Sequence, residues 1–182
     1  KFGKVYWDGT FSNQNLPVIL ITNHVSWWDG FWAVVLNEKF LHRKFHVMIL
    51  EEQLRKHWYF NYCGGFSIRK SDRSMIETMQ YAGQLLDDPR NLVLIFPQGE
   101  IQSIYQPSFR FEKGIERILR GKEGKVRIAF SVNMVDYLSR PKPGLYVYFR
   151  EEPDILCTRN VLEERYNAFY RQCLEKQMQL KS

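Results

Sequence analysis

Short apolar runs alternate along this chain with longer amphipathic stretches, which is the pattern of strands and helices in an α/β protein. Apolar runs rich in β-branched and aromatic residues predict strands at about 2–7, 17–22, 45–50, 91–96, 126–134 and 145–149. Helical periodicity predicts helices at about 27–39, 51–59, 73–86, 109–120 and from Asn160 onward. The alternation predicts a single α/β domain over residues 1–182, with a mixed, mostly parallel sheet flanked by helices in three layers.

The strand predicted at 17–22 ends in a cluster of polar residues. Asn23 and His24 follow it directly, and Ser26 and Asp29 come just before the next apolar run. A serine followed three residues later by an acidic residue is a helix-start signal. We therefore expect His24 in a tight turn after a strand and Asp29 in the first turn of a helix. Open α/β sheets commonly build their sites at such strand ends.

Two interpretations of His24 and Asp29 are open on spacing alone. A neutral histidine can remove a proton from a hydroxyl, and a carboxylate bonded to its other ring nitrogen fixes the tautomer and stabilises the imidazolium. In the plainer interpretation, Asp29 is the acidic member of a capping box and His24 is a turn residue.

Asn23-His24, followed after four residues by Asp29, resembles the first motif of the glycerolipid (lysophospholipid) acyltransferase family. Residues 96–100 resemble the third motif, which is usually Phe-Pro-Glu-Gly-Thr. Residues 64–73 resemble the second motif, and residues 111–114 resemble the family's segment after the third motif. The likeness covers about residues 1–150 and keeps the family's motif order.

The resemblance implies a glycerolipid acyltransferase-like fold and an O-acyltransferase of lipid metabolism, in the general area of phospholipid biosynthesis. The donor would be an acyl thioester, either acyl-CoA or acyl carrier protein, and the acceptor a hydroxyl of a lipid-like molecule. His24 would act as the general base and Asp29 would orient it. The acceptor oxygen would attack the thioester directly, so the chemistry needs no covalent intermediate and no cofactor beyond the co-substrate.

Arg69, Lys70 and Arg73 form the main basic cluster, directly before the helix predicted at 73–86. Cationic side chains at a helix N-terminus suit an anion. The resemblance places the acceptor's phosphate here, although Lys70 stands where the family usually has Arg. A solvated charged turn is the plainer interpretation of the same residues.

Gln98, Gly99 and Glu100 occupy the third motif, and the resemblance implies that they line the acceptor pocket. Gln98 stands where the family usually has Glu, and Glu100 stands where it usually has Thr. The negative charge is thus moved by two residues, to a place where it would repel a nearby phosphate. We therefore expect lysophosphatidate to be a poor acceptor.

The net charge is +6, which favours an anionic partner such as phospholipid headgroups, coenzyme A or an acidic carrier protein. A surplus that only promotes solubility is the alternative. The basic residues match no recognised nucleic-acid motif, so we expect no nucleic-acid partner. Aromatic side chains crowd the start of the first helix and fit an acyl-chain groove, a membrane interface or ordinary core packing. These are Trp27, Trp28, Phe31 and Trp32, and we do not expect all four to face one core.

The three cysteines lack paired spacing, and no secretory signal is evident, which favours reduced thiols in the cytoplasm. No apolar run approaches the roughly 20 residues of a spanning helix. We expect peripheral binding to the anionic inner face of the membrane. His42 and His46 are four residues apart, but the sequence offers no convincing third ligand, so we expect no metal.

Two other classes of protein compete with the enzyme. One is a lipid- or membrane-binding module of the same fold with impaired catalysis, which the altered third motif favours and the His24–Asp29 pair opposes. The other is a Ser-His-Asp hydrolase, which would need an activated serine. No Gly-x-Ser-x-Gly elbow occurs in the chain.

Overall fold

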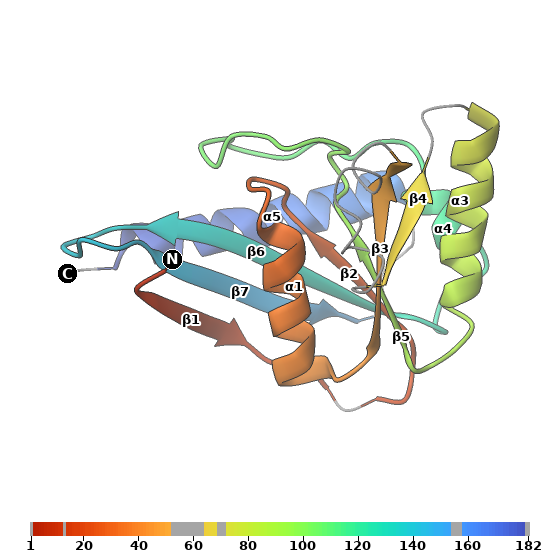
Figure 1. Ribbon diagram of the computed structural model, residues 1–182, viewed down its shortest axis with the longest axis horizontal. Coiled ribbons are helices and arrows are strands. Elements are labelled where there is room, and N and C mark those ends of the chain that lie inside the picture. Colours follow the sequence, from red (N-terminus) through yellow and green to blue (C-terminus); the bar gives the residue numbers. More distant parts are fainter. Residues whose placement is uncertain (1, 13, 52–63, 69–71, 154–157, 181–182) are drawn as a thin grey trace.

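In the described part of the chain, seven strands form one sheet in the order β1-β7-β6-β2-β5-β3-β4 (Figure 1). The computed structural model describes residues 2–12, 14–51, 64–68, 72–153 and 158–180. The strands are β1 (Lys4–Gly9), β2 (Val18–Thr22), β3 (Lys44–Leu50), β4 (Gly65–Ile68), β5 (Asn91–Ile95), β6 (Arg127–Asp136) and β7 (Gly144–Glu152). Neighbouring strands are parallel except β6 and β7, which are antiparallel, so the predicted mixed, mostly parallel sheet is confirmed.

Helices cover both faces of this sheet. They are α1 (Asp29–Leu36), the π-helical turn η1 (Asn37–Leu41), α3 (Asp72–Leu85), α4 (Ile115–Ile118) and α5 (Arg159–Met178). Helix α1 packs on one face, and α3, α4 and α5 pack on the other (Figure 1). The predicted three-layer α/β fold is therefore confirmed.

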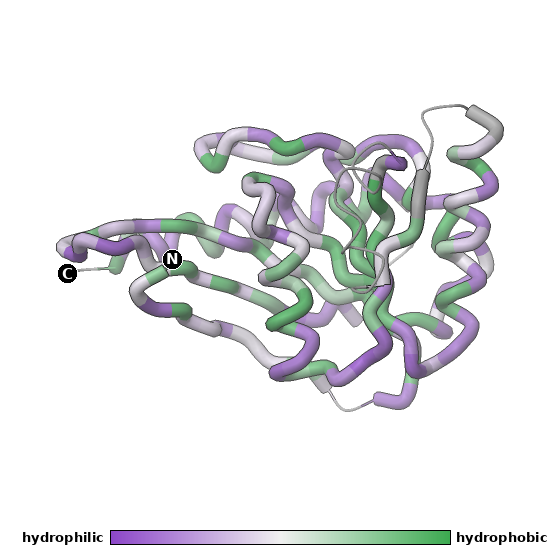
Figure 2. The backbone as a smooth tube through the Cα atoms, in the orientation of Figure 1, coloured by the Kyte–Doolittle hydropathy of each residue, from purple (hydrophilic) through white to green (hydrophobic). Residues whose placement is uncertain are grey.

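The two central strands, β2 and β5, are buried along their whole length. Side chains alternate between the faces, so that Val18 and Leu20 face α1 while Ile19 and Ile21 face α3 and α5. A parallel strand covered on both faces needs a continuous apolar sequence. Figure 2 shows this continuous hydrophobic run in the middle of the sheet.

The chain from 109 to 120 is less helical than predicted, because only α4 forms there. The backbone N–H groups of Phe109 and Phe111 donate to side chains of α5 instead of continuing a helix. Phe109 bonds Asn167 Oδ1 at 2.8 Å and Phe111 bonds Glu163 Oε2 at 2.7 Å. Helix α5 therefore holds the segment that follows the third motif in an extended form.

Three other details differ from the prediction. Helix α1 begins at Asp29, two residues late, and continues into η1. Strand β4, which begins at Gly65, was not predicted, and it pairs in parallel with β3. Helix α5 begins after Thr158, so Asn160 lies inside its first turn rather than at its cap. The helix predicted at 51–59 falls almost entirely outside the described residues.

Gly64 permits the tight approach between the second motif and β3. Its φ is +77°, and a Cβ atom there would lie 1.9 Å from the carbonyl oxygen of Phe45. Only glycine fits this backbone. In the described part of the chain, no helix is long and apolar enough to span a membrane.

Candidate active site

His24 and Asp29 lie together at the carboxyl end of β2, as the sequence predicts. His24 Nδ1 is 3.0 Å from Asp29 Oδ2. Asp29, the first residue of α1, is fully buried, whereas 22% of the His24 side chain is exposed. The ring of His24 is thus held by a buried carboxylate and is open to solvent in part.

A single oxygen of Asp29 accepts all the hydrogen bonds from the turn. The backbone N–H groups of Val25 and Ser26 each donate to Oδ2 at 2.7 Å, beside the His24 ring. A carboxylate only accepts, so Nδ1 of a neutral His24 carries the proton and Nε2 keeps its lone pair. These charge-assisted bonds explain why a buried carboxylate is tolerated here.

The capping interpretation also describes part of the turn. Ser26 Oγ accepts from the Trp28 backbone N–H at 3.2 Å, while the Ser26 backbone N–H donates to Asp29. This is only half of a capping box, because the serine oxygen bonds the N–H of Trp28 rather than that of Asp29, and the N-cap of α1 is Trp28, with no side-chain cap hydrogen bond. The same Asp29 oxygen contacts His24, so the carboxylate holds the histidine as well as the turn.

The loop after β5 holds His24 from the other side. The His24 backbone N–H donates to Gln98 Oε1 at 3.0 Å, and the His24 carbonyl accepts from the Gln102 backbone N–H at 2.8 Å. The imidazole stacks on Phe96, with ring centroids 4.0 Å apart and planes 19° apart. The first and third motifs therefore meet at His24, and its ring and backbone are both fixed.

The three predicted residues of the third motif have different environments. Gln98 is buried, and its Nε2 has no hydrogen-bond partner among the described residues. Gly99 has a φ of +73°, which favours glycine, and its N–H closes a turn onto Phe96 at 3.1 Å. Glu100 is exposed and accepts from the Gln102 side chain at 3.4 Å. Gln98 alone of these three contacts His24 directly.

The basic cluster of the second motif is only partly placed. Arg69 and Lys70 lie outside the described residues. The backbone of Arg73 lies in the first turn of α3, and its side chain is outside the description.

Asn23, which belongs to the first motif, is held by Asn133, a residue that the sequence did not single out. Asn23 Nδ2 donates to the Asn133 carbonyl at 3.0 Å, and the Asn133 N–H donates to Asn23 Oδ1 at 2.8 Å. Both residues are almost fully buried. The sequence signal for Asn133 is that a polar residue interrupts the apolar run of β6, because a buried polar side chain needs a hydrogen-bond partner.

The aromatic residues beside the site divide between core and surface. Trp32 is buried in the α1 face of the core. Trp27 and Trp28 are 40% and 54% exposed, and both pack against Phe31, with ring centroids 5.4 and 5.6 Å apart. The expectation that the four would not share one core is confirmed.

Comparison with known proteins places the chain in a family. A family model described as Acyltransferase matches residues 6–139, which is more than half of the chain. The chain belongs to the acyltransferase family. This is the family of the glycerolipid and 1-acylglycerol-3-phosphate acyltransferases, so the resemblance in the motifs is confirmed. Neither a search of curated proteins nor a search of solved structures gave a match.

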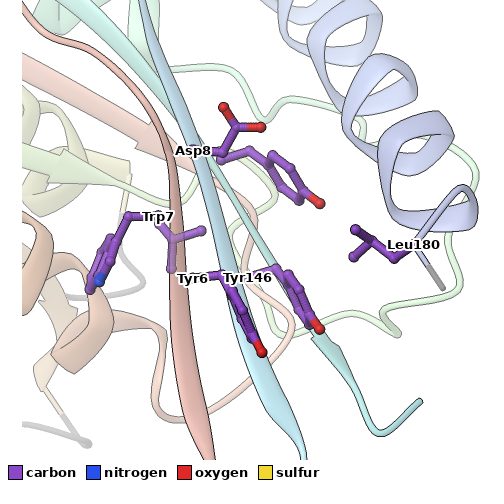
Figure 3. A pocket seen from close by; sticks show the side chains of 7 residues that line it. Tyr6, Trp7, Asp8, Tyr146 and Leu180 are labelled. Atoms are coloured by element: carbon purple, nitrogen blue, oxygen red, sulfur yellow. The ribbon is translucent and has the colours of Figure 1, made fainter. Parts of the chain in front are cut away.

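This member of the acyltransferase family also has a pocket away from the His24 turn. The pocket has a volume of about 220 Å³ and lies between β1, β7 and the residues that follow α5 (Figure 3). It is lined by Tyr6, Trp7, Asp8, Tyr146, Val147, Tyr148 and Leu180. His24 and Asp29 do not line it, so it is separate from the candidate active site.

Proposed function

We propose that this chain transfers a fatty acyl group from acyl-CoA or acyl carrier protein to a hydroxyl of a lipid-like acceptor. His24 Nε2 takes the hydroxyl proton while the acceptor oxygen attacks the thioester carbonyl. The tetrahedral intermediate collapses, the carbon–sulfur bond breaks, and the proton passes from His24 to the leaving thiolate. Asp29 holds the ring and stabilises the imidazolium between these two steps.

The observation that carries this proposal is the 3.0 Å contact between His24 Nδ1 and Asp29 Oδ2. Asp29 is buried and accepts two backbone N–H groups at the same oxygen, so the turn holds that oxygen beside the ring before any substrate binds. A fixed acceptor at Nδ1 leaves Nε2 as the basic nitrogen. Together with membership of the acyltransferase family, this supports acyl transfer over a purely structural role.

Gln98 presents a different group to the acceptor from the glutamate that the family usually has at this position. Its oxygen accepts from the His24 backbone, which leaves a buried amide N–H₂ as a donor with no partner in the described part of the chain. A glutamate at this position would present a second acceptor and a negative charge instead. The N–H of Gly99 is already bonded within the loop, so Gly99 contributes shape rather than a donor. We assign Arg69, Lys70 and Arg73 to an anionic group of the substrates and leave Glu100 at the pocket rim.

Peripheral binding to an anionic membrane is the second part of the proposal. The exposed Trp27 and Trp28 lie three to four residues from His24, and the chain has a net charge of +6. Tryptophan favours the membrane interface, and cations attract anionic headgroups. Placing this surface on the inner face of the membrane in the cytoplasm would bring the lipid acceptor to His24.

The membrane part is tested by flotation with anionic and neutral vesicles at low and high salt. We expect association with anionic vesicles that weakens as salt screens the charges. The double variant Trp27→Ser/Trp28→Ser should bind more weakly, while Tyr137→Ser, which removes an exposed aromatic residue elsewhere, should bind as the parent does. No association with anionic vesicles even at low salt would contradict this part.

A lipid-binding module with impaired catalysis is the second candidate, because the third motif departs from the family pattern at Gln98 and Glu100. Incubation with labelled acyl-CoA or acyl carrier protein and a panel of lysolipids and hydroxylated lipids separates the two. Acyl transfer supports the enzyme, and vesicle binding with no transfer from either donor supports the module.

The acceptor is tested by competing lysophosphatidate against hydroxylated lipids and comparing kcat/KM for each. We expect lysophosphatidate to be the poorer acceptor, and Glu100→Thr to improve it, because that variant removes a charge that repels phosphate. A clear preference for lysophosphatidate that Glu100→Thr does not increase would contradict this expectation.

A further inference from the structure

Asn133 lies where β2 has just ended and its neighbour β6 continues. The last pair of residues in the parallel ladder is Thr22 and Ser131. Beyond it, the Asn23 side-chain amide bonds both the N–H and the C=O of Asn133. A primary amide offers one acceptor and donors side by side, as a peptide group does. Asn23 therefore continues the ladder through its side chain while its backbone turns away toward His24.

The side chain of Asn133 reaches the other residue of the pair. Its Nδ2 lies 3.5 Å from Asp29 Oδ1, and the contact is buried. The groups of the turn all donate to Oδ2, so Asn133 approaches the oxygen that they leave open. At 3.5 Å this contact is longer than the usual N–H···O hydrogen bond of about 2.7–3.2 Å, so it adds little strength.

We infer that Asn133 is a positioning residue for the His24–Asp29 pair, a role that rests on the proposed function of His24. Its backbone fixes Asn23, the residue before His24, and its side chain turns the Asp29 carboxylate so that Oδ2 faces His24 Nδ1. Both contacts span 104 to 110 residues of sequence, so they tie the turn to the core of the sheet. A glutamine or leucine at position 133 would keep the backbone contacts and change only the side-chain contact.

The side-chain role can be separated from a general loss of stability. Asn133→Ala keeps both bonds to Asn23, because those use the backbone of residue 133. Asn133→Leu removes the donor while filling a similar volume, and it replaces Asn133→Ala in the test if the alanine variant folds poorly. Asn37→Ala is the matched control. Asn37 is also buried, and its side chain bonds the N–H and the C=O of Arg43 at 3.0 and 2.8 Å.

The readout is the tautomer of the neutral His24 ring, measured from its ¹⁵N chemical shifts in the intact chain above pH 7. His24→Ala identifies the signal. We expect Nδ1–H to dominate in the parent and in Asn37→Ala, and a mixture of the two tautomers in both Asn133 variants. With a working transfer assay, we expect kcat to fall on the order of tenfold with KM nearly unchanged.

An unchanged His24 tautomer in folded Asn133→Ala or Asn133→Leu would overturn the inference and leave Asn133 a structural residue. An equal change in Asn37→Ala would overturn it as well, because the effect would then be a general one. The tautomer needs no substrate. Absence of acyl transfer in the parent chain would therefore defeat the proposed function without altering the outcome of this test.

Discussion

Two histidines of this chain are each bonded through one ring nitrogen, and their partners differ in charge. His24 donates to the carboxylate of Asp29 at the end of β2, in a turn that is partly open to solvent. His46 lies within β3, is buried, and contacts Asn91 Oδ1 through Nε2 at 3.2 Å. Asn91 also donates to the Leu85 carbonyl, so its oxygen faces His46 and Nε2 of the ring carries the proton.

The comparison shows what turns a buried histidine contact into a candidate base. A neutral amide stabilises the positive charge that proton transfer creates on an imidazole less than a carboxylate does. Burial lowers the pKa of His46, and its bond to Asn91 only partly opposes this. A carboxylate stabilises that charge, and the strand end leaves the second nitrogen of His24 accessible. His46 therefore links β3 and β5 to α3, while His24 is free to react.

The largest expected effect is that of Asp29→Asn. Asparagine can still accept from Val25 and Ser26, but it brings no charge to stabilise the imidazolium. We expect kcat to fall roughly 10²–10⁴-fold with the fold retained, measured by transfer kinetics alongside circular dichroism. If a folded Asp29→Asn variant kept nearly full activity, the charge of the bonded partner would not explain why His24 and His46 differ.

Removing the hydrogen-bond acceptors of His24 and His46 should have a smaller effect, which separates stability from activity at these two histidines. Gln98→Ala leaves the His24 backbone N–H without its acceptor, and Asn91→Ala leaves the His46 ring N–H without one. Each should lower the free energy of unfolding by about 1–3 kcal/mol, measured by urea denaturation. Only Gln98→Ala should also lower the transfer rate per folded molecule. Equal loss of rate in both variants would place His46 in the reaction.

The smallest effect is a pH dependence of stability at His46. Its pKa is lowered in the folded state, so the unfolded chain binds the proton more readily below its ordinary pKa of about 6.5. Stability contributed by neutral His46 is therefore complete above that pH and is lost as pH falls toward the lowered pKa. The slope from one proton cannot exceed about 1.4 kcal/mol per pH unit.

His46→Gln measures that contribution, because glutamine can donate to Asn91 and does not titrate in this range. We expect urea denaturation midpoints of the parent to fall more steeply between pH 7.5 and 5 than those of the variant. Identical pH profiles would show that His46 titrates alike in the folded and unfolded chains.

Much of the fold follows from local sequence. The strands at the centre of the sheet are continuous apolar runs because both their faces are covered, and this leaves a clear pattern. Strand β4 and the short α4 were harder to predict, because distant parts of the chain decide them. β4 exists through its pairing with β3, and α4 is short because α5 binds the backbone at Phe109 and Phe111.

The candidate site likewise combines contacts that nearby sequence predicts with contacts that depend on distant parts of the chain. His24 and Asp29 are five residues apart, so strand and helix signals were enough to predict their contact. Gln98 was predicted by its motif, although not its bond to the His24 backbone. Asn133 could not be placed from sequence, because its contacts depend on the register between β2 and β6.

The most direct test of the account compares acyl transfer by His24→Ala and His46→Gln with that of the parent chain. Loss of a general base lowers rates by about 10²–10⁴-fold. We predict a loss of that size in His24→Ala with the fold retained, and a rate within a few-fold of the parent in His46→Gln. A folded His24→Ala that transfers acyl groups at nearly the parent rate would contradict the account.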